Sequence, residues 1–358
     1  MCDQGDFDQD RGMTAGTTSV TPPPDPATRH VDAADPQAIS GSLPGHDLEG
    51  DGASAAPRRP GAPLPVAFHR LPRAIPHRGY WWRPLVAVAV AAVTYLAMFL
   101  LLIVVSLVTP AVWPGLDISA EMTDPLNPLD QFISLGMLAL GLPAVLLGTL
   151  AGYGRAGIAH SVIGRFRWGL LGRVAIVVVP VYLLINVGVN LLLARNDLVV
   201  PALDATVLAA WAIALLLAPL QSAAEEYVFR ALPLQALGTW LRWPVVGILL
   251  PVPLFVLGHG YDWLGQVDIA LFALTMGLLA WKTGGIEIPV LLHAVNNTTL
   301  FALAPLIPGF TEQGEVTVAG FLLATVPMLL LSAGIWGWFS RREGLGAWEP
   351  RRGAPPPR

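Results

Sequence analysis

Cysteine is nearly absent from this 358-residue sequence, in which the only one is Cys2. A single thiol excludes an intramolecular disulfide and any metal site built from several cysteines. Charged residues are also scarce, at 13% of the chain, against about 25% in a typical soluble domain. Many of the acids lie near the start of the chain, so nucleic-acid binding is not indicated. With 54% hydrophobic residues and a mean hydropathy of +0.58, the chain is not composed like a water-soluble protein.

The sequence contains several long apolar runs. Between Pro84 and Trp113 there is no Asp, Glu, Lys or Arg, and an uncharged run of more than about 18 residues is typical of a membrane-spanning helix. Helices satisfy their backbone hydrogen bonds internally in lipid. We therefore predict an all-α, polytopic membrane helix bundle of about eight transmembrane helices. The predicted spans are 84–110, 130–152, 168–194, 206–232, 244–259, 266–282, 286–305 and 317–340.

The two ends of the chain differ from this apolar body. Residues 1–80 are rich in Pro, Gly and Asp and hold too few large apolar side chains to offset the entropy cost of ordering, which predicts a disordered tail. Arginines precede the first span and follow the last, whereas the first connection carries only acids. The positive-inside rule then predicts that both termini are cytoplasmic. We expect a multi-pass protein of the cell membrane, with a transmembrane domain at 81–341 and a short basic, Pro-rich tail at 342–358.

Three segments place polar groups where lipid disfavours them, and intramembrane ionisable residues indicate function by default. The first is SAAEEYVFR, which contains Glu225, Glu226 and Arg230. Glu226 and Arg230 are i,i+4 neighbours on a helix and can form a buried ion pair. Glu225 points about 100° away from Glu226. It has no local cation, which predicts a specific tertiary partner or a role as general base.

The other two segments carry histidines. FVLGH places His259 at the end of the fifth predicted span, and HAVNN places His293 and Asn297 on one face of the seventh, with Asn296 pointing away. Each segment has a purely structural interpretation, because His and Asn side chains also join membrane helices by hydrogen bonds. Three such segments on three spans are more typical of a hydrolytic centre. One conflict arises, because Glu225 lies towards the inner end of its predicted span whereas His259 ends a span that runs outward.

EEYVFR, FVLGH and HAVNN occur in the order of the EExxxR, FxxxH and HxxxN motifs, and the region around 205–305 resembles the core of the CPBP family. This family comprises the CAAX-protease and bacteriocin-processing membrane proteins, also called Abi. It includes endopeptidases that remove the last three residues of prenylated proteins, and bacterial members tied to bacteriocin maturation or self-immunity. The resemblance implies that Glu225 is the catalytic carboxylate and that His259 shares its water. It also implies that His293 and Asn297 complete the site, where they would donate hydrogen bonds to the oxyanion.

The same resemblance gives Glu226 and Arg230 a supporting role and leaves the cofactor open. Glu225, His259 and His293 are a ligand set suited to Zn²⁺ with water in the fourth position. No HExxH motif occurs, so the arrangement of soluble zinc proteases is absent. The sequence does not decide between a metalloprotease and a glutamate-dependent protease.

The predicted function is an intramembrane endopeptidase that acts on a membrane-associated or prenylated protein or peptide. Its expected partners are that substrate and the lipid bilayer, with no nucleic acid. Two alternatives stay open. One is a non-catalytic membrane immunity or scaffold protein of the same fold. The other is a transporter with a proton-relay carboxylate, although the sequence shows no inverted repeat.

Overall fold

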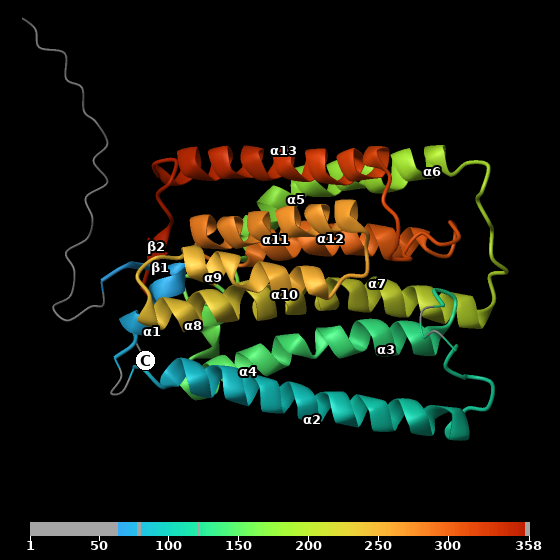
Figure 1. Cartoon of the computed structure of the whole chain (residues 1–358), viewed down its shortest axis with the longest axis horizontal. Coiled ribbons are helices and arrows are strands. Elements are labelled where there is room, and N and C mark those ends of the chain that lie inside the picture. The colour runs from blue at the N-terminus through green and yellow to red at the C-terminus, as the bar shows by residue number, and fades with distance from the viewer. Residues whose placement is uncertain (1–63, 77–79, 121, 123, 355–358) are drawn as a thin grey trace, which may run out of the picture. The chain divides into compact units, whose positions relative to one another are not determined.

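The computed structural model describes residues 64–76, 80–120, 122 and 124–354, which lie within one compact unit (Figure 1). The α-helices of this part of the chain are α1 (Leu71–Ala74), α2 (Arg83–Val112), α3 (Pro128–Ala139), α4 (Gly141–Tyr153), α5 (Trp168–Tyr182), α6 (Asn190–Leu193), α7 (Ala205–Glu226), α8 (Leu232–Trp240), α9 (Val245–Leu249), α10 (Pro251–Leu257), α11 (Trp263–Thr283), α12 (Glu287–Leu303) and α13 (Val318–Glu343). The shorter elements are the 3₁₀ turns η1 (Phe68–Arg70) and η2 (Ala156–Ala159), the π-helical segments η3 (Leu183–Val189) and η4 (Tyr227–Ala231), and the strands β1 (Val66–Ala67) and β2 (Arg352–Gly353).

The predicted all-α membrane bundle is confirmed. Six helical segments of the described residues are long and apolar enough to cross a membrane. They are Arg83–Val112, Pro128–Tyr153, Trp168–Leu193, Ala205–Trp240, Trp263–Thr283 and Val318–Glu343. The other two predicted spans are helical but shorter. The span predicted at 244–259 is the pair α9–α10, which is interrupted before Pro251 because proline has no N–H for the helical ladder. The span predicted at 286–305 is α12, with 17 residues.

The fourth span is longer than the predicted 206–232. Helix α7 continues through the π-helical turn η4 into α8, so the apolar segment runs from Ala205 to Trp240. Pro233 lies directly after this turn, and its ring would clash with the carbonyl four residues earlier in a regular helix. A π-turn accommodates such a local mismatch and is frequent at functional sites. Glu225 therefore lies inside the segment rather than towards its end.

The predicted boundary of the N-terminal tail at residue 80 was wrong. Residues 64–76 are part of the folded unit, because β1, η1 and α1 pack their apolar side chains into the main core. Phe68 and Leu71 are 0% exposed and Ile75 is 2% exposed. Polar and Pro-rich composition over the first 60 residues concealed a short apolar motif that docks against α8. The rest of the predicted tail, residues 1–63 and 77–79, lies outside the described residues.

The C-terminal segment that was predicted as a tail also packs on this unit in its described part, residues 344–354. Strand β2 pairs antiparallel with β1, with Val66 opposite Gly353. The buried ammonium of Lys282, at the end of α11, donates hydrogen bonds to the carbonyls of Gly346 (2.7 Å), Ala347 (3.1 Å) and Glu349 (2.7 Å). One buried cation therefore replaces the hydrogen bonds that these carbonyls would otherwise make with water.

Truncation experiments should locate the true boundary of the tail. Deletion of residues 1–57 should leave the melting temperature in detergent unchanged, because every core side chain of the described residues is retained. Deletion of residues 1–75 removes Phe68, Leu71 and Ile75, each worth about 2 kcal/mol of buried apolar surface, and should lower the melting temperature by roughly 5 °C or more. The measurement is thermal unfolding of both purified truncations beside the full chain. Equal melting temperatures for all three would contradict the assignment.

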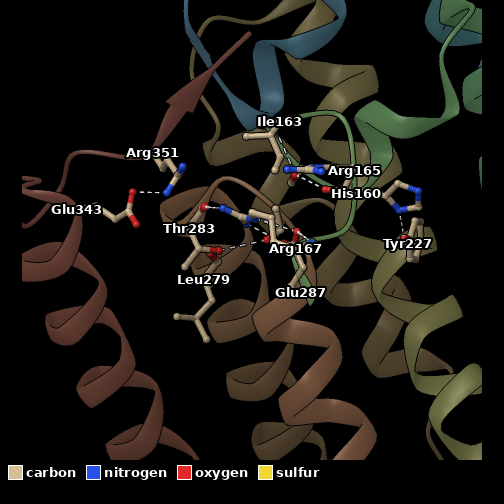
Figure 2. A network of polar contacts seen from close by, with 12 residues as sticks. His160, Ile163, Arg165, Arg167, Tyr227, Leu279, Thr283, Glu287, Glu343 and Arg351 are labelled. Carbon is tan, nitrogen blue, oxygen red and sulfur yellow. Dashed lines mark hydrogen bonds and ion pairs between the residues drawn. The ribbon is translucent and has the colours of Figure 1, made fainter. Parts of the chain in front are cut away.

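The start of α12 is held by a buried ion pair (Figure 2). The guanidinium of Arg167 donates through Nε and Nη2 to the carboxylate of Glu287 at 2.8 and 2.7 Å, and through Nη1 to the carbonyl of Thr283 at 2.9 Å. Glu287 is 0% exposed. Beside this pair, His160 Nδ1 forms a hydrogen bond with the hydroxyl of Tyr227 in η4. Burial lowers the pKa of His160, which favours the neutral ring in this contact. These bonds hold the connection between α4 and α5 against η4 and the start of α12.

Candidate active site

The polar residues predicted on α7 and α12 meet between these two helices. Glu225 and Glu226 end α7, and His293 and Asn297 lie one turn apart on α12. His293 Nε2 lies 3.5 Å from Glu225 Oε2, and its Nδ1 lies 2.7 Å from Glu226 Oε1. Asn297 Nδ2 lies 3.2 Å from His293 Nε2. Both carboxylates and the imidazole are buried, so this cluster is held by its own hydrogen bonds rather than by solvent.

Glu225 is fixed through only one of its carboxylate oxygens. Gln221 Nε2 donates to Glu225 Oε1 at 2.6 Å, and Glu225 Oε2 is buried without a hydrogen-bond partner among the described residues. The residue is 9% exposed. A carboxylate with one oxygen tethered and the other available, in a setting of low dielectric, is suited to accept a proton from a bound water.

The sequence analysis missed Gln221. It lies one turn before Glu225, and its amide oxygen accepts from Asn297 Nδ2 at 3.0 Å and from Ser222 Oγ at 3.2 Å. Because the amide oxygen of Gln221 accepts these two hydrogen bonds, its amide nitrogen is the atom that faces Glu225. Gln221 connects the two helices of the site, and the signal that could have found it is its i,i+4 spacing to Glu225.

The hydrogen bonds define the tautomer of His293. Glu226 Oε1 is an acceptor when ionised, so Nδ1 of His293 carries the proton and donates to it. Nε2 then carries a lone pair and accepts from the amide of Asn297. Both ring nitrogens of His293 are therefore engaged within the cluster.

Glu226 and Arg230 form the ion pair predicted from their i,i+4 spacing. Arg230 Nη1 lies 3.1 Å from Glu226 Oε1, and both side chains are 2% exposed or less. The guanidinium also lies over the ring of Phe255 at 4.3 Å and that of Phe272 at 5.7 Å, contacts that stabilise a desolvated cation. Glu226 thus accepts from a histidine and balances an arginine at the same oxygen.

His259 makes no hydrogen bond with Glu225 or His293 among the described contacts. Its Nδ1 lies 2.8 Å from the carbonyl of Phe255, one turn earlier, and because a carbonyl only accepts, Nδ1 carries the proton. Its Nε2 is left with a lone pair. The ring of Phe255 packs against both imidazoles, with centroid distances of 4.9 Å to His259 and 6.3 Å to His293. The ring of Phe255 therefore packs against both histidines, and the backbone carbonyl of Phe255 orients His259.

A second polar side chain that the sequence analysis missed comes from η3. Asn186 Nδ2 donates to Asn296 Oδ1 at 3.1 Å and to Thr299 Oγ1 at 2.9 Å. Asn296 Nδ2 in turn donates to Asn297 Oδ1 at 3.1 Å. Asn296, which was predicted to point away from the face shared by His293 and Asn297, bonds to Asn186 and fixes the orientation of the Asn297 amide. A π-helical segment shifts the register of the side chains along a helix. Residue spacing for a regular helix therefore does not indicate that Asn186 faces the site.

The arrangement of donors does not fit a three-ligand zinc site. Within the described residues, no group of three His, Cys, Asp or Glu side chains is placed to hold a metal ion. His293 has no free lone pair, because Glu226 and Asn297 engage both ring nitrogens. A zinc ligand must offer a lone pair to the metal. Glu225, His259 and His293 would have to exchange these hydrogen bonds before they could act as the predicted ligand set.

The chain is similar to known proteins over the region that carries this cluster. Residues 205–299 match the family described as "Rce1-like: Type II CAAX prenyl endopeptidase Rce1-like". A relative from Bacillus subtilis (strain 168), "Uncharacterized protein YyaK", is 30% identical over 150 residues, which cover 37% of this chain and 49% of the relative. The chain thus spans about half the length of this curated relative. No solved structure matches the chain.

The family match covers EEYVFR, FVLGH and HAVNN, and it extends from α7 to α11 and over most of α12. The resemblance to the CAAX-protease family that these three segments predicted is therefore confirmed, and the site-bearing segment 205–299 is similar to the Rce1-like type II CAAX prenyl endopeptidases.

Proposed function

We propose that this protein is an intramembrane endopeptidase in which Glu225 is the general base. The observation that carries the proposal is the carboxylate of Glu225, which is buried, tethered at Oε1 by Gln221 and unpartnered at Oε2 among the described residues. Glu226 also has an unpartnered buried oxygen, Oε2, but its charge is balanced by Arg230, whereas no arginine or lysine among the described residues forms an ion pair with Glu225. An unsatisfied buried acceptor costs about 1–3 kcal/mol. A catalytic role would explain why the chain keeps a buried Glu225 with an unsatisfied oxygen.

In this proposal, a water molecule binds Glu225 Oε2 and donates its second hydrogen to Nε2 of His259. Glu225 takes a proton as the water oxygen attacks the peptide carbonyl carbon. The tetrahedral intermediate then collapses, the C–N bond breaks, and the proton on Glu225 passes to the leaving nitrogen. General base catalysis of this kind contributes about 10²–10⁴-fold in rate.

The oxyanion needs donors, and the resemblance assigns this role to His293 and Asn297. Both hydrogens of the Asn297 amide are engaged, by Gln221 and by His293. The substrate carbonyl would have to replace His293 Nε2 as the acceptor of one of them. With its Nδ1 proton hydrogen-bonded to Glu226 and a lone pair on Nε2, His293 orients the Asn297 amide, and Asn297 is the donor to the oxyanion. Glu226 and Arg230 act indirectly, by holding the Nδ1 proton of His293 in place. No step of this mechanism passes through a metal.

The substrate class follows from the site and the family description. The cluster lies on apolar helices, so a peptide must reach it from the membrane, and a prenyl group is one chemical means of bringing a C-terminus there. We infer a membrane-bound substrate with a lipidated cysteine close to its C-terminus.

Cleavage of defined peptides in proteoliposomes tests this function. A peptide with an S-farnesyl cysteine four residues from its end should be cut after the modified cysteine, with release of the C-terminal tripeptide. The same peptide without the lipid should be cut at least about tenfold more slowly, since a lipid chain contributes to membrane binding. Mass spectrometry of the products is the readout.

Two further arms of this experiment separate the alternatives. A zinc chelator should leave the rate unchanged if water activation rests on Glu225 and His259 alone, whereas loss of cleavage with rescue by Zn²⁺ would assign a metal. If neither the farnesylated peptide nor a library of membrane-bound peptides is cut, the protein is a non-catalytic membrane protein of the same fold.

A further inference from the structure

Residues of α5, η3 and α13 line a groove, and neither α5 nor α13 carries a residue of the site described above. Its volume is about 810 Å³, within the range of about 300–1,000 Å³ for ligand-binding cavities. The lining is apolar along almost its whole length. Ile176 and Leu330, on opposite walls, are 73% and 68% exposed. Side chains of this kind on a membrane helix contact lipid tails.

The two ends of the groove differ in charge. Arg173, near the start of α5, and Arg342, near the end of α13, line one end, and Ile185 and Pro327 line the other. At about 1.5 Å per residue, the length of α13 between Pro327 and Arg342 is roughly 22 Å. A hydrocarbon core is about 30 Å thick, so the groove is about one and a half times as long as one leaflet is thick, and both arginines lie at one end of it.

The arginine end has an excess of positive charge. Arg173 forms no ion pair with any described residue, and Arg342 Nε lies 3.7 Å from Glu343 Oε1. Glu343 is the nearest acid, but it is already paired with Arg351, which hydrogen-bonds to its Oε2 (Figure 2). The positive charges of Arg173 and Arg342 are therefore not balanced, because the only carboxylate beside them among the described contacts already pairs with Arg351. Basic pockets between membrane helices bind anionic headgroups.

We propose that this groove binds one anionic phospholipid, with the phosphate between Arg173 and Arg342 and an acyl chain along the apolar walls. Length, lining and charge favour this occupant over a zwitterionic lipid, because the headgroup of a zwitterionic lipid has no net charge to offer two arginines. The groove involves neither Glu225 nor α7, so the proposal stands independently of the peptidase function.

The glycines of α13 provide a matched pair of variants. A Cβ added at Gly334, which lines the groove, meets no atom within 4 Å, and the same is true at Gly337, which does not line it. Gly334→Phe should fill the groove, and Gly337→Phe is its control. For the headgroup, Arg173→Gln with Arg342→Gln removes both charges, and Arg341→Gln removes a neighbouring charge outside the groove.

The experiment is native mass spectrometry of each purified protein after equilibration with vesicles of equal parts dioleoyl-phosphatidylglycerol and dioleoyl-phosphatidylcholine. The unsubstituted protein should retain phosphatidylglycerol in preference. The double arginine variant should lose about tenfold or more of that preference, because each basic residue near the surface contributes a few-fold in binding. Gly334→Phe should lower retention of both lipids, and the two controls should match the unsubstituted protein.

Three results would overturn the proposal. The first is equal retention of the two lipids by the unsubstituted protein. The second is an unchanged preference in the double arginine variant. The third is displacement of the retained lipid by a farnesylated peptide but not by added phosphatidylglycerol, which would assign the groove to a prenyl chain.

Discussion

Glu225→Gln should lower kcat for peptide cleavage by about 10²–10⁴-fold, the contribution of a general base, while the protein remains folded. The amide has the same shape as the carboxylate, and its oxygen can still accept from Gln221 at the position of Oε1. It cannot take a proton from water at the position of Oε2. The binding of substrate should change little, so the loss should fall on kcat rather than on KM.

A matched glutamate separates this effect from a general change in charge. Glu315 is an exposed loop residue, and Glu315→Gln should cleave at the rate of the unsubstituted protein. The circular dichroism spectrum and the melting temperature of Glu225→Gln should match those of Glu315→Gln and of the unsubstituted protein. Cleavage by Glu225→Gln within about tenfold of the unsubstituted rate would be too fast for a protein that has lost its general base, and Glu225 would then have to be reassigned.

The spacing of residues predicted much of the site, because i,i+4 neighbours share a helix face wherever the helix is regular. The pairing of Glu226 with Arg230 and the shared face of His293 and Asn297 follow from this rule alone. The need for Glu225 to find a tertiary partner follows from the cost of burying a lone carboxylate. The structure supplies His293 from α12 and Gln221 from its own helix.

Other features depend on contacts that spacing does not encode. Asn186 reaches Asn296 from a π-helical segment, where the 3.6-residue repeat does not hold. The continuation of α7 into α8 passes a proline that a sequence pattern places at a helix end. Phe68 is buried because η1 docks against α8, and β1 beside it pairs with a strand almost 300 residues later. Composition averaged over the tail gives no sign of such long-range contacts.

The Arg230→Ala protein should be less stable than the unsubstituted protein by roughly 3–5 kcal/mol, the cost of breaking a buried ion pair by removing one partner. Glu226 would remain at 0% exposure, with His293 as its only described partner. The guanidinium also fills space between Phe255 and Phe272, so the truncation loses packing as well as charge.

Thermal unfolding in detergent measures this effect, with Arg195→Ala as the matched control. Arg195 is exposed at the end of α6, and its guanidinium donates only to the carbonyl of Leu192, at 3.2 Å, among the described contacts. Its removal should change stability by less than about 0.5 kcal/mol. Arg230→Ala should also slow peptide cleavage, because Arg230 helps to position Glu226, the acceptor that orients the ring of His293. If Arg230→Ala melts together with Arg195→Ala and the unsubstituted protein, the ion pair contributes nothing to the fold, and Glu226 must be stabilised by His293 alone.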